Sequence, residues 1–151
     1  MKLFHNATIS VFSHEKDNEN LTAIEQAFSL LVPLNFTNEK IAVKKITATG
    51  FSERKIFIFE LHLQKERHIS AFIDRLKSSL CEIDKQKIQI QLDTRLDEEL
   101  FFFLRFDKWD LIERKELHLT ESGDCFHIKL SVAAFPKKRG VAMGLLRKLF
   151  N

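Results

Sequence analysis

The sequence predicts a single α+β domain with a mainly antiparallel sheet and about three helices on one face of that sheet. Two observations support this fold class: strand-like segments follow each other without an intervening helix at two places, and segments with helical apolar spacing separate the others. The predicted order is β-α-β-β-α-β-β-β-α. No linker or repeat interrupts the chain, so residues 1–151 are expected to form one domain.

The first half of the chain contributes strands and helices in turn. Residues 3–14 predict a strand that joins the sheet, and Asp17–Asn20 offers capping side chains for a helix from Leu21 to Leu31, which Pro33 ends. Residues 41–49 and 55–64 predict two strands, joined at Gly50–Arg54. A second helix follows, because one apolar stripe runs at helical spacing from Ile69 to Leu80.

The second half is less regular. Residues 84–98 fit a short helix or turn followed by a loop, and the apolar run 99–106 predicts a strand that is buried on both faces. Residues 108–113 predict one helical turn. Residues 115–120 and 125–135 predict a hairpin across Glu121–Asp124. Pro136 then opens a final helix over 137–150.

The predicted core is aromatic and dry, because the chain has 15 phenylalanines and no tyrosine, and phenylalanine has no hydroxyl group to satisfy. Its expected members come from all the later strands and helices. They are Leu61, Leu63, Ile69, Phe72, Ile73, Leu76, Leu80, Phe102, Leu104, Ile128, Leu130, Leu145 and Leu149.

Composition and motifs exclude several classes of protein. Two distant cysteines, Cys81 and Cys125, predict no disulfide framework and a reduced, cytoplasmic location. No segment reaches the roughly 18 apolar residues of a membrane helix. The motifs of nucleotide-binding loops, zinc proteases and serine hydrolases are missing, so we expect no enzyme and no cofactor. The net charge of +3 permits an anionic partner.

Two clusters contain potential metal ligands. Cys125 and His127 share one face of a strand, and His118 could lie opposite across the hairpin. An acidic group around Asp93 and Asp97 could bind Mg²⁺. Structural roles and a solvated turn explain these residues more simply, and we expect no metal.

The most distinctive charges stand at the start of the predicted final helix. Its first turn would contain Lys137, Lys138 and Arg139, although a helix N-terminus carries positive partial charge and disfavours cations. Either this is a surface turn, or an acid from elsewhere in the fold compensates, or free N–H groups and cations converge on a phosphate. Arg105 and Lys108, at the end of the apolar strand, would extend such a phosphate site.

Three segments resemble one archaeal family, that of predicted RNA-binding proteins or predicted exosome subunits. They are Leu92–Asp97, Leu104–Lys108 and Ala134–Arg139, and the helix around Arg67–Ile69 is similar too. The resemblance implies a fold like that of the ribosomal protein that binds 5S rRNA, with an antiparallel sheet backed by helices. The chain departs from the family in keeping only Gly50 of a glycine-rich turn, and in having phenylalanine where tyrosine is common before Arg105.

Together, the charges and the resemblance predict a non-catalytic RNA-binding module that is associated with RNA processing or the archaeal exosome. The expected phosphate ligands are Lys137, Lys138, Arg139, Arg105, Lys108 and Arg95. Trp109 would either stack on an exposed base or serve as a partly buried anchor. The alternatives are a protein-interaction module in an RNA-processing assembly without RNA contact, and an enzyme whose site the sequence hides.

Overall fold

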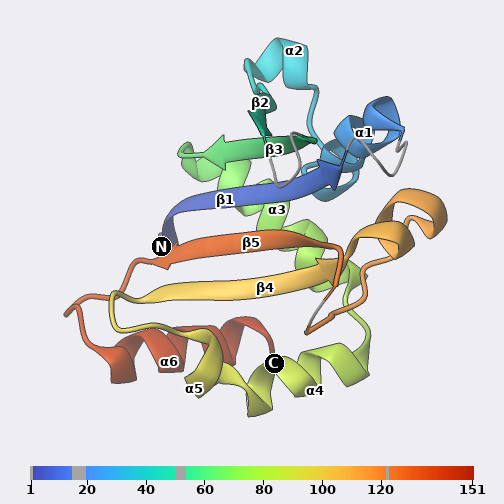
Figure 1. Cartoon of the computed structure of the whole chain (residues 1–151). Coiled ribbons are helices and arrows are strands. Elements are labelled where there is room, and N and C mark those ends of the chain that lie inside the picture. The colour runs from blue at the N-terminus through green and yellow to red at the C-terminus, as the bar shows by residue number, and fades with distance from the viewer. Residues whose placement is uncertain (1, 15–19, 50–53, 122) are drawn as a thin grey trace.

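The sheet of this protein has five strands in the order β2-β3-β1-β5-β4, and every neighbouring pair is antiparallel (Figure 1). The computed structural model describes residues 2–14, 20–49, 54–121 and 123–151. The strands are β1 (Phe4–His14), β2 (Lys44–Thr49), β3 (Lys55–Leu63), β4 (Phe101–Asp107) and β5 (Cys125–Val132). The predicted α+β class is confirmed, and the first strand joins the sheet at its centre.

Three longer helices pack on one face of the sheet with shorter helices beside them. They are α1 (Leu21–Leu31), α3 (Glu66–Ser79) and α6 (Arg139–Leu149), and the shorter ones are α2 (Phe36–Glu39), α4 (Glu82–Ile90) and α5 (Leu92–Arg95). Figure 1 shows α3 behind β1 and β5, with α6 and α4 below β4. Asn20 caps α1, because its side chain accepts from the Ala23 amide at 3.1 Å.

The core lies between these helices and one face of the sheet. In β1 the side chains of Ala7, Ile9 and Val11 are buried, whereas Thr8 and Ser10 between them are half-buried. This alternation follows from the two-residue period of a strand. None of the described helices lies on the opposite face (Figure 1). All predicted core residues are buried except Leu145, which is half-buried at the margin. The inner stripe of α6 instead runs through Ala142, Leu146 and Leu149.

The predicted hairpin of residues 115–120 and 125–135 is wrong. Both edges of β5 are taken, since β1 and β4 pair with it. Residues 115–120 therefore lie along the outer edge of β4. There the Asp107 amide donates to the His118 carbonyl at 2.9 Å, and the Thr120 amide donates to the Arg105 carbonyl at 3.0 Å. Residues 110–114 form a single π-helical turn, in agreement with the helical turn predicted there.

The short helix predicted within residues 84–98 is present as α4 and α5, and the helical part is longer than expected because it runs to Arg95. Another expectation for the second half needed correction. The final helix begins at Arg139 rather than at Lys137, and Lys138 is its N-cap residue. The Lys138 amide donates to the Pro136 carbonyl at 2.8 Å, so residues 136–138 form a tight turn ahead of the helix.

Three predicted turns fall partly outside the described residues: Asp17–Glu19 of the capping segment, residues 50–53 of the strand connection, and Ser122 of the turn at Glu121–Asp124. In the described parts of the chain, no helix has both the length and the apolar character needed to span a bilayer.

Candidate nucleic-acid interface

The face of the sheet opposite the helices, here called the open face, presents polar, basic and aromatic side chains together. Each strand contributes every second residue to it. Its central members are Thr8, Ser10 and Phe12 of β1, Glu60 and His62 of β3, His127, Lys129 and Ser131 of β5, and Phe101, Phe103 and Arg105 of β4. β4 was predicted to be buried on both faces; this is wrong, because the helices cover only one of them.

The strand register places cations beside aromatic rings on β4 and β5. Phe103 lies opposite Lys129, and Arg105 lies opposite His127. The Lys129 ammonium is 4.1 Å from the centroid of the Phe101 ring. Phe103 is 39% exposed, which is unusual for a phenylalanine. We call these five residues, Phe101, Phe103, Arg105, His127 and Lys129, the strip.

A hollow, here called the edge hollow, adjoins the strip where β4 faces α5 and the segment before β5. Its lining residues are Gln91, Thr94, Arg95, Phe103, Arg105, Thr120 and Glu121. Arg95 is held in place by Gln91, whose side-chain oxygen accepts from its Nε at 3.0 Å and its Nη2 at 2.6 Å. The Gln91 amide in turn donates to the Glu121 carboxylate at 3.0 Å. The polar groups of the hollow are therefore already oriented.

Burial shifts several ionisation equilibria in this region. It lowers the pKa of Arg95, and the nearby Arg105 lowers it further while Glu121 opposes both effects. The pKa of His127 is lowered by burial and by the charge of Arg105 opposite. Burial also raises the pKa of the Cys125 thiol, whose sulfur lies 3.4 Å from Nε2 of His127. The positive charge of the strip therefore rests on Arg105 and Lys129.

The predicted phosphate ligands separate into several places. Arg95 and Arg105 meet at the edge hollow. Lys137 lies at the other end of the strip, in a second hollow that it lines with Phe101, Ser131 and His5. Lys138 is exposed next to it. Among the described residues, neither lysine side chain forms a hydrogen bond or an ion pair.

Arg139 forms a structural link between α6 and α5. Its guanidinium donates to the carbonyls of Leu96 at 2.9 Å and Asp97 at 3.3 Å, and to the Asp93 carboxylate at 2.9 Å. The carbonyls at the end of α5 carry negative partial charge, which favours a cation there. This is the predicted alternative in which an acid from elsewhere in the fold compensates the charge, and it removes much of the apparent conflict at the start of α6.

Lys108 is buried and has no access to a surface ligand. Its ammonium donates to the Phe12 carbonyl at 2.8 Å and lies 4.9 Å from the centroid of the Trp109 ring. No local pattern indicates this burial, since a lysine after an apolar strand is usually exposed. Trp109 is 37% exposed and is partly anchored through this contact.

Sequence reasoning missed Phe101, Phe103, His127 and Lys129 as candidate interface residues. The apolar run hid them, although one signal was present: Arg105 shares the two-residue period of Phe101 and Phe103. A charged residue in that phase indicates that its face of the strand is solvated. The same argument assigns Lys129 to the open face of the next strand.

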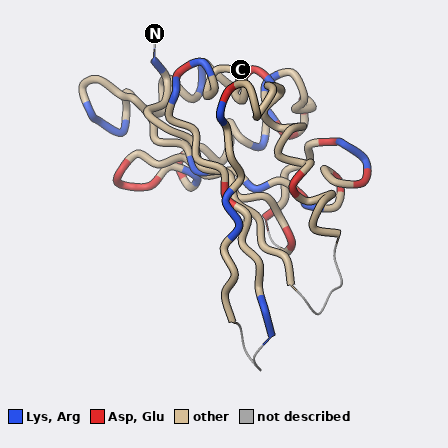
Figure 2. Tube along the Cα trace, turned by 90° about the horizontal axis from the view of Figure 1, so that it is seen from above, with Lys and Arg blue, Asp and Glu red and all other residues tan. Residues whose placement is uncertain are grey.

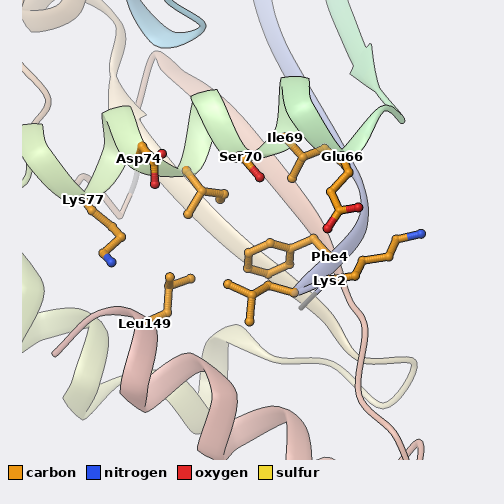
Figure 3. A pocket seen from close by; sticks show the side chains of 10 residues that line it. Lys2, Phe4, Glu66, Ile69, Ser70, Asp74, Lys77 and Leu149 are labelled. Atoms are coloured by element: carbon orange, nitrogen blue, oxygen red, sulfur yellow. The ribbon is translucent and has the colours of Figure 1, made fainter.

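Other parts of the molecule offer weaker sites. A cavity between α3 and α6 has Phe4, Ile69 and Leu149 in its walls, and both acids and bases line it (Figure 3). Its mixed charges, Glu66 and Asp74 against Lys2 and Lys77, give no preference for an anion. Among the described residues, no group of three or more histidine, cysteine or acidic side chains is arranged to hold a metal.

Known proteins resemble this chain along nearly its whole length. An RNA-binding protein of Pyrococcus abyssi (strain GE5 / Orsay), PAB1135, is 24% identical over 144 residues, which are 95% of this chain and 92% of that protein. The crystal structure of AF2318 from Archaeglobus fulgidus, assigned to DUF54, is 25% identical with a TM-score of 0.82 and covers 97% of this chain and 99% of its own. Mth689 from Methanothermobacter thermautotrophicus, a DUF54 protein, is 22% identical with a TM-score of 0.78, and 99% of each chain is covered.

A family model described as RNA binding matches residues 6–132, which is more than half of the chain and includes the whole strip. The match spans β1 to β5 and ends before α6. Two of the three segments that carried the resemblance, Leu92–Asp97 and Leu104–Lys108, lie within it. The chain therefore belongs to this archaeal family of predicted RNA-binding proteins.

Proposed function

We propose that this protein is a non-catalytic RNA-binding module that contacts RNA through the β4–β5 half of its open face. One observation carries the proposal: the exposed ring of Phe103, the half-buried ring of Phe101 and two exposed cations lie side by side on a sheet surface that none of the described helices covers. Phe103 is directly opposite Lys129, and Arg105 follows on the same strand face. RNA-binding sheets use such surfaces, with rings for bases and cations for phosphates.

The phosphate ligands in this proposal are Arg105 and Lys129 on the strip, with Lys137 and Lys138 continuing the positive charge beyond Phe101. Arg95 lies at the edge hollow, where its hydrogen bonds to Gln91 hold its guanidinium in place. Lys108 is left out because it is buried. Arg139 is left out because the Asp93 carboxylate already neutralises its charge and the carbonyls of Leu96 and Asp97 occupy its guanidinium. No residue is assigned to catalysis.

The proposed biological setting is RNA processing, including association with the archaeal exosome. This rests on the sequence resemblance alone. In that setting the module would supply affinity for RNA, while the chemistry would belong to a partner protein.

A titration of labelled RNA followed by fluorescence polarisation tests the proposal. We expect binding at ~50 mM salt that weakens steeply as salt is added, because each phosphate contact releases counterions. The variant Arg105→Gln, Lys129→Gln should bind less tightly and with a shallower salt dependence. The matched control is Arg114→Gln, Lys115→Gln, which removes the same charge from the exposed π-helical turn. Affinity weaker than ~100 µM at that salt would contradict the proposal.

A specific surface favours the second candidate function, docking to another protein. Ile83 and Ile90 on α4 are 66% and 83% exposed, and their spacing of seven residues places them on one side of the helix. Exposed apolar pairs of this kind often belong to protein interfaces. Under this alternative, Ile83→Ser, Ile90→Ser would abolish a complex isolated from native extract, while the charge variant of the strip would leave it intact.

A further inference from the structure

We infer that the edge hollow accepts a single unpaired base, so that the protein selects single-stranded RNA over duplex RNA. This inference rests on the proposed function and specifies its substrate class. The hollow has a volume of about 340 Å³ and is open to solvent, which is the size range of small-ligand sites. Phe103, whose side chain is 39% exposed, lines one side of it.

The chemistry of the other walls suits the edge of a base. Gln91 and Arg95 contribute an amide and a guanidinium, and Thr94 contributes a hydroxyl group whose proton is donated to the Gln91 carbonyl at 3.1 Å. The Thr94 oxygen therefore remains an acceptor, while Arg95 is a donor. Donors and acceptors beside an aromatic platform are what recognises a base that is splayed out of its strand.

The position of the cations defines a path for the RNA backbone. A base stacked on Phe103 would have Lys129 across the strand pair on one side and Arg105 two residues along β4 on the other. The phosphates that flank this nucleotide would thus each meet a cation. A second base can stack on Phe101, about 6.7 Å further along the strand. The Lys129 ammonium, which now lies over that ring, would then move to a phosphate.

Paired RNA does not fit this arrangement. The bases of a duplex stack on their neighbours and turn their faces away from the protein, so none of them can reach a ring within a flat sheet. A duplex would therefore contact only the cations. Binding of unpaired RNA should depend on both the rings and the charges, whereas binding of duplex RNA should depend on the charges alone.

The test compares two RNA probes, an unpaired 12-mer and a blunt duplex of the same length, in polarisation titrations with the full chain. Phe103→Ala should weaken binding of the unpaired RNA by about tenfold, the loss typical of one stacked base, and leave the duplex within about twofold. Phe103→Tyr should restore binding. Phe103→Leu keeps apolar volume without a ring and should behave like Phe103→Ala, which separates stacking from folding.

Phe135→Ala is the matched control, since Phe135 is another exposed ring, at 96%, that lies outside the open face and does not line the hollow. It should change the affinity for unpaired RNA by less than about threefold. Thermal melts confirm that each variant is folded. Equal affinity for both probes, with no effect of Phe103→Ala, would overturn this inference and leave the proposed function standing. Failure of the parent protein to bind either probe would instead contradict the proposed function.

Discussion

The β4–β5 half of the sheet and the β2–β3 hairpin both carry positive charge, but they differ in how tightly they pack against the rest of the protein. Along β4 and β5, buried side chains alternate with more exposed ones. The ring of Phe102 packs against that of Phe150, the residue that follows α6, with 5.9 Å between the two ring centroids. Every residue of β2 is exposed or half-buried. Figure 2 shows the described parts of β2 and β3 extending beyond the rest of the described chain, with basic residues on both strands.

The two regions also treat their aromatic rings differently. On the hairpin, Lys45 lies over the Phe57 ring, 4.6 Å from its centroid, and the Phe59 ring next to it is buried. On β4, Phe103 remains exposed on the open face. Charge alone therefore does not distinguish the proposed RNA interface from the hairpin. A rigid, helix-backed surface that exposes rings loses less conformational freedom on binding than a projecting hairpin does.

Substitutions of core residues should show most strongly that the β4–β5 half is more tightly packed than the hairpin. Phe102→Ala in β4 should lower the free energy of unfolding by about 3–5 kcal/mol, since the ring is fully buried. Ile46→Ala in β2 should cost only about 1 kcal/mol, because this side chain is half-buried. Denaturant melts of both variants measure the two losses. Similar losses would show that the hairpin is as firmly packed as the helix-backed half.

Removing the Arg139 link between α6 and α5 should cause the next largest loss of stability. Arg139→Gln removes charged hydrogen bonds to Asp93, Leu96 and Asp97 and should cost about 1–2 kcal/mol, reduced by the partial exposure of the guanidinium. Lys137→Gln, Lys138→Gln should change stability by less than about 0.5 kcal/mol. Thermal melts separate the two. A large loss in the lysine variant would reveal a structural role for those side chains.

The salt dependence of RNA binding should locate the interface within the sheet. Arg105→Gln, Lys129→Gln should reduce the slope of log affinity against log salt by about 1.4, as expected for two contacts with a single strand. Lys44→Gln, Lys45→Gln on the hairpin removes the same charge and should leave the slope nearly unchanged. The reverse result would move the interface to the hairpin. Polarisation titrations at several salt concentrations provide both slopes.

The smallest effect concerns the protonation of His127. Its pKa is lowered from 6.5 by burial and by Arg105, so the unfolded chain takes up a proton more readily than the folded protein. Its contribution to stability is therefore complete above about pH 6.5 and is lost as the pH falls toward the lowered pKa. His127→Gln should melt with a weaker decline between pH 7.5 and pH 5. An identical decline in both proteins would contradict this assignment.

Bound RNA should change that titration. The groups that face His127 are Arg105 across the strand pair, the Cys125 sulfur at 3.4 Å and the edge of the Phe12 ring. A phosphate held by Arg105 would offset the charge that now disfavours protonation, so the pKa of His127 should rise when RNA binds. NMR titration of the imidazole with and without RNA measures the change. An unaltered pKa would place the phosphate away from this end of the strip.

Much of the fold could be predicted from local patterns. The helical stripe from Ile69 to Leu80 and the alternation in residues 55–63 specify helix and strand, because the spacing of apolar residues states which face is buried. Strands that follow each other without a helix between them favour antiparallel pairing, and this too was correct. Arg105 was identified as an interface candidate because a lone cation ends an apolar run.

Only the tertiary structure decided which partners these residues have. Arg139 is bound by carbonyls more than 40 residues earlier in the chain, Lys108 reaches the carbonyl of Phe12, and residues 115–120 lie along β4 because β5 has no free edge. The same holds for Phe103, which is exposed because the helices all pack on the other face. A local pattern shows the spacing of apolar residues, and so whether a segment is a helix or a strand. The burial and charge environment of a side chain depend on segments that the chain brings together only when it folds.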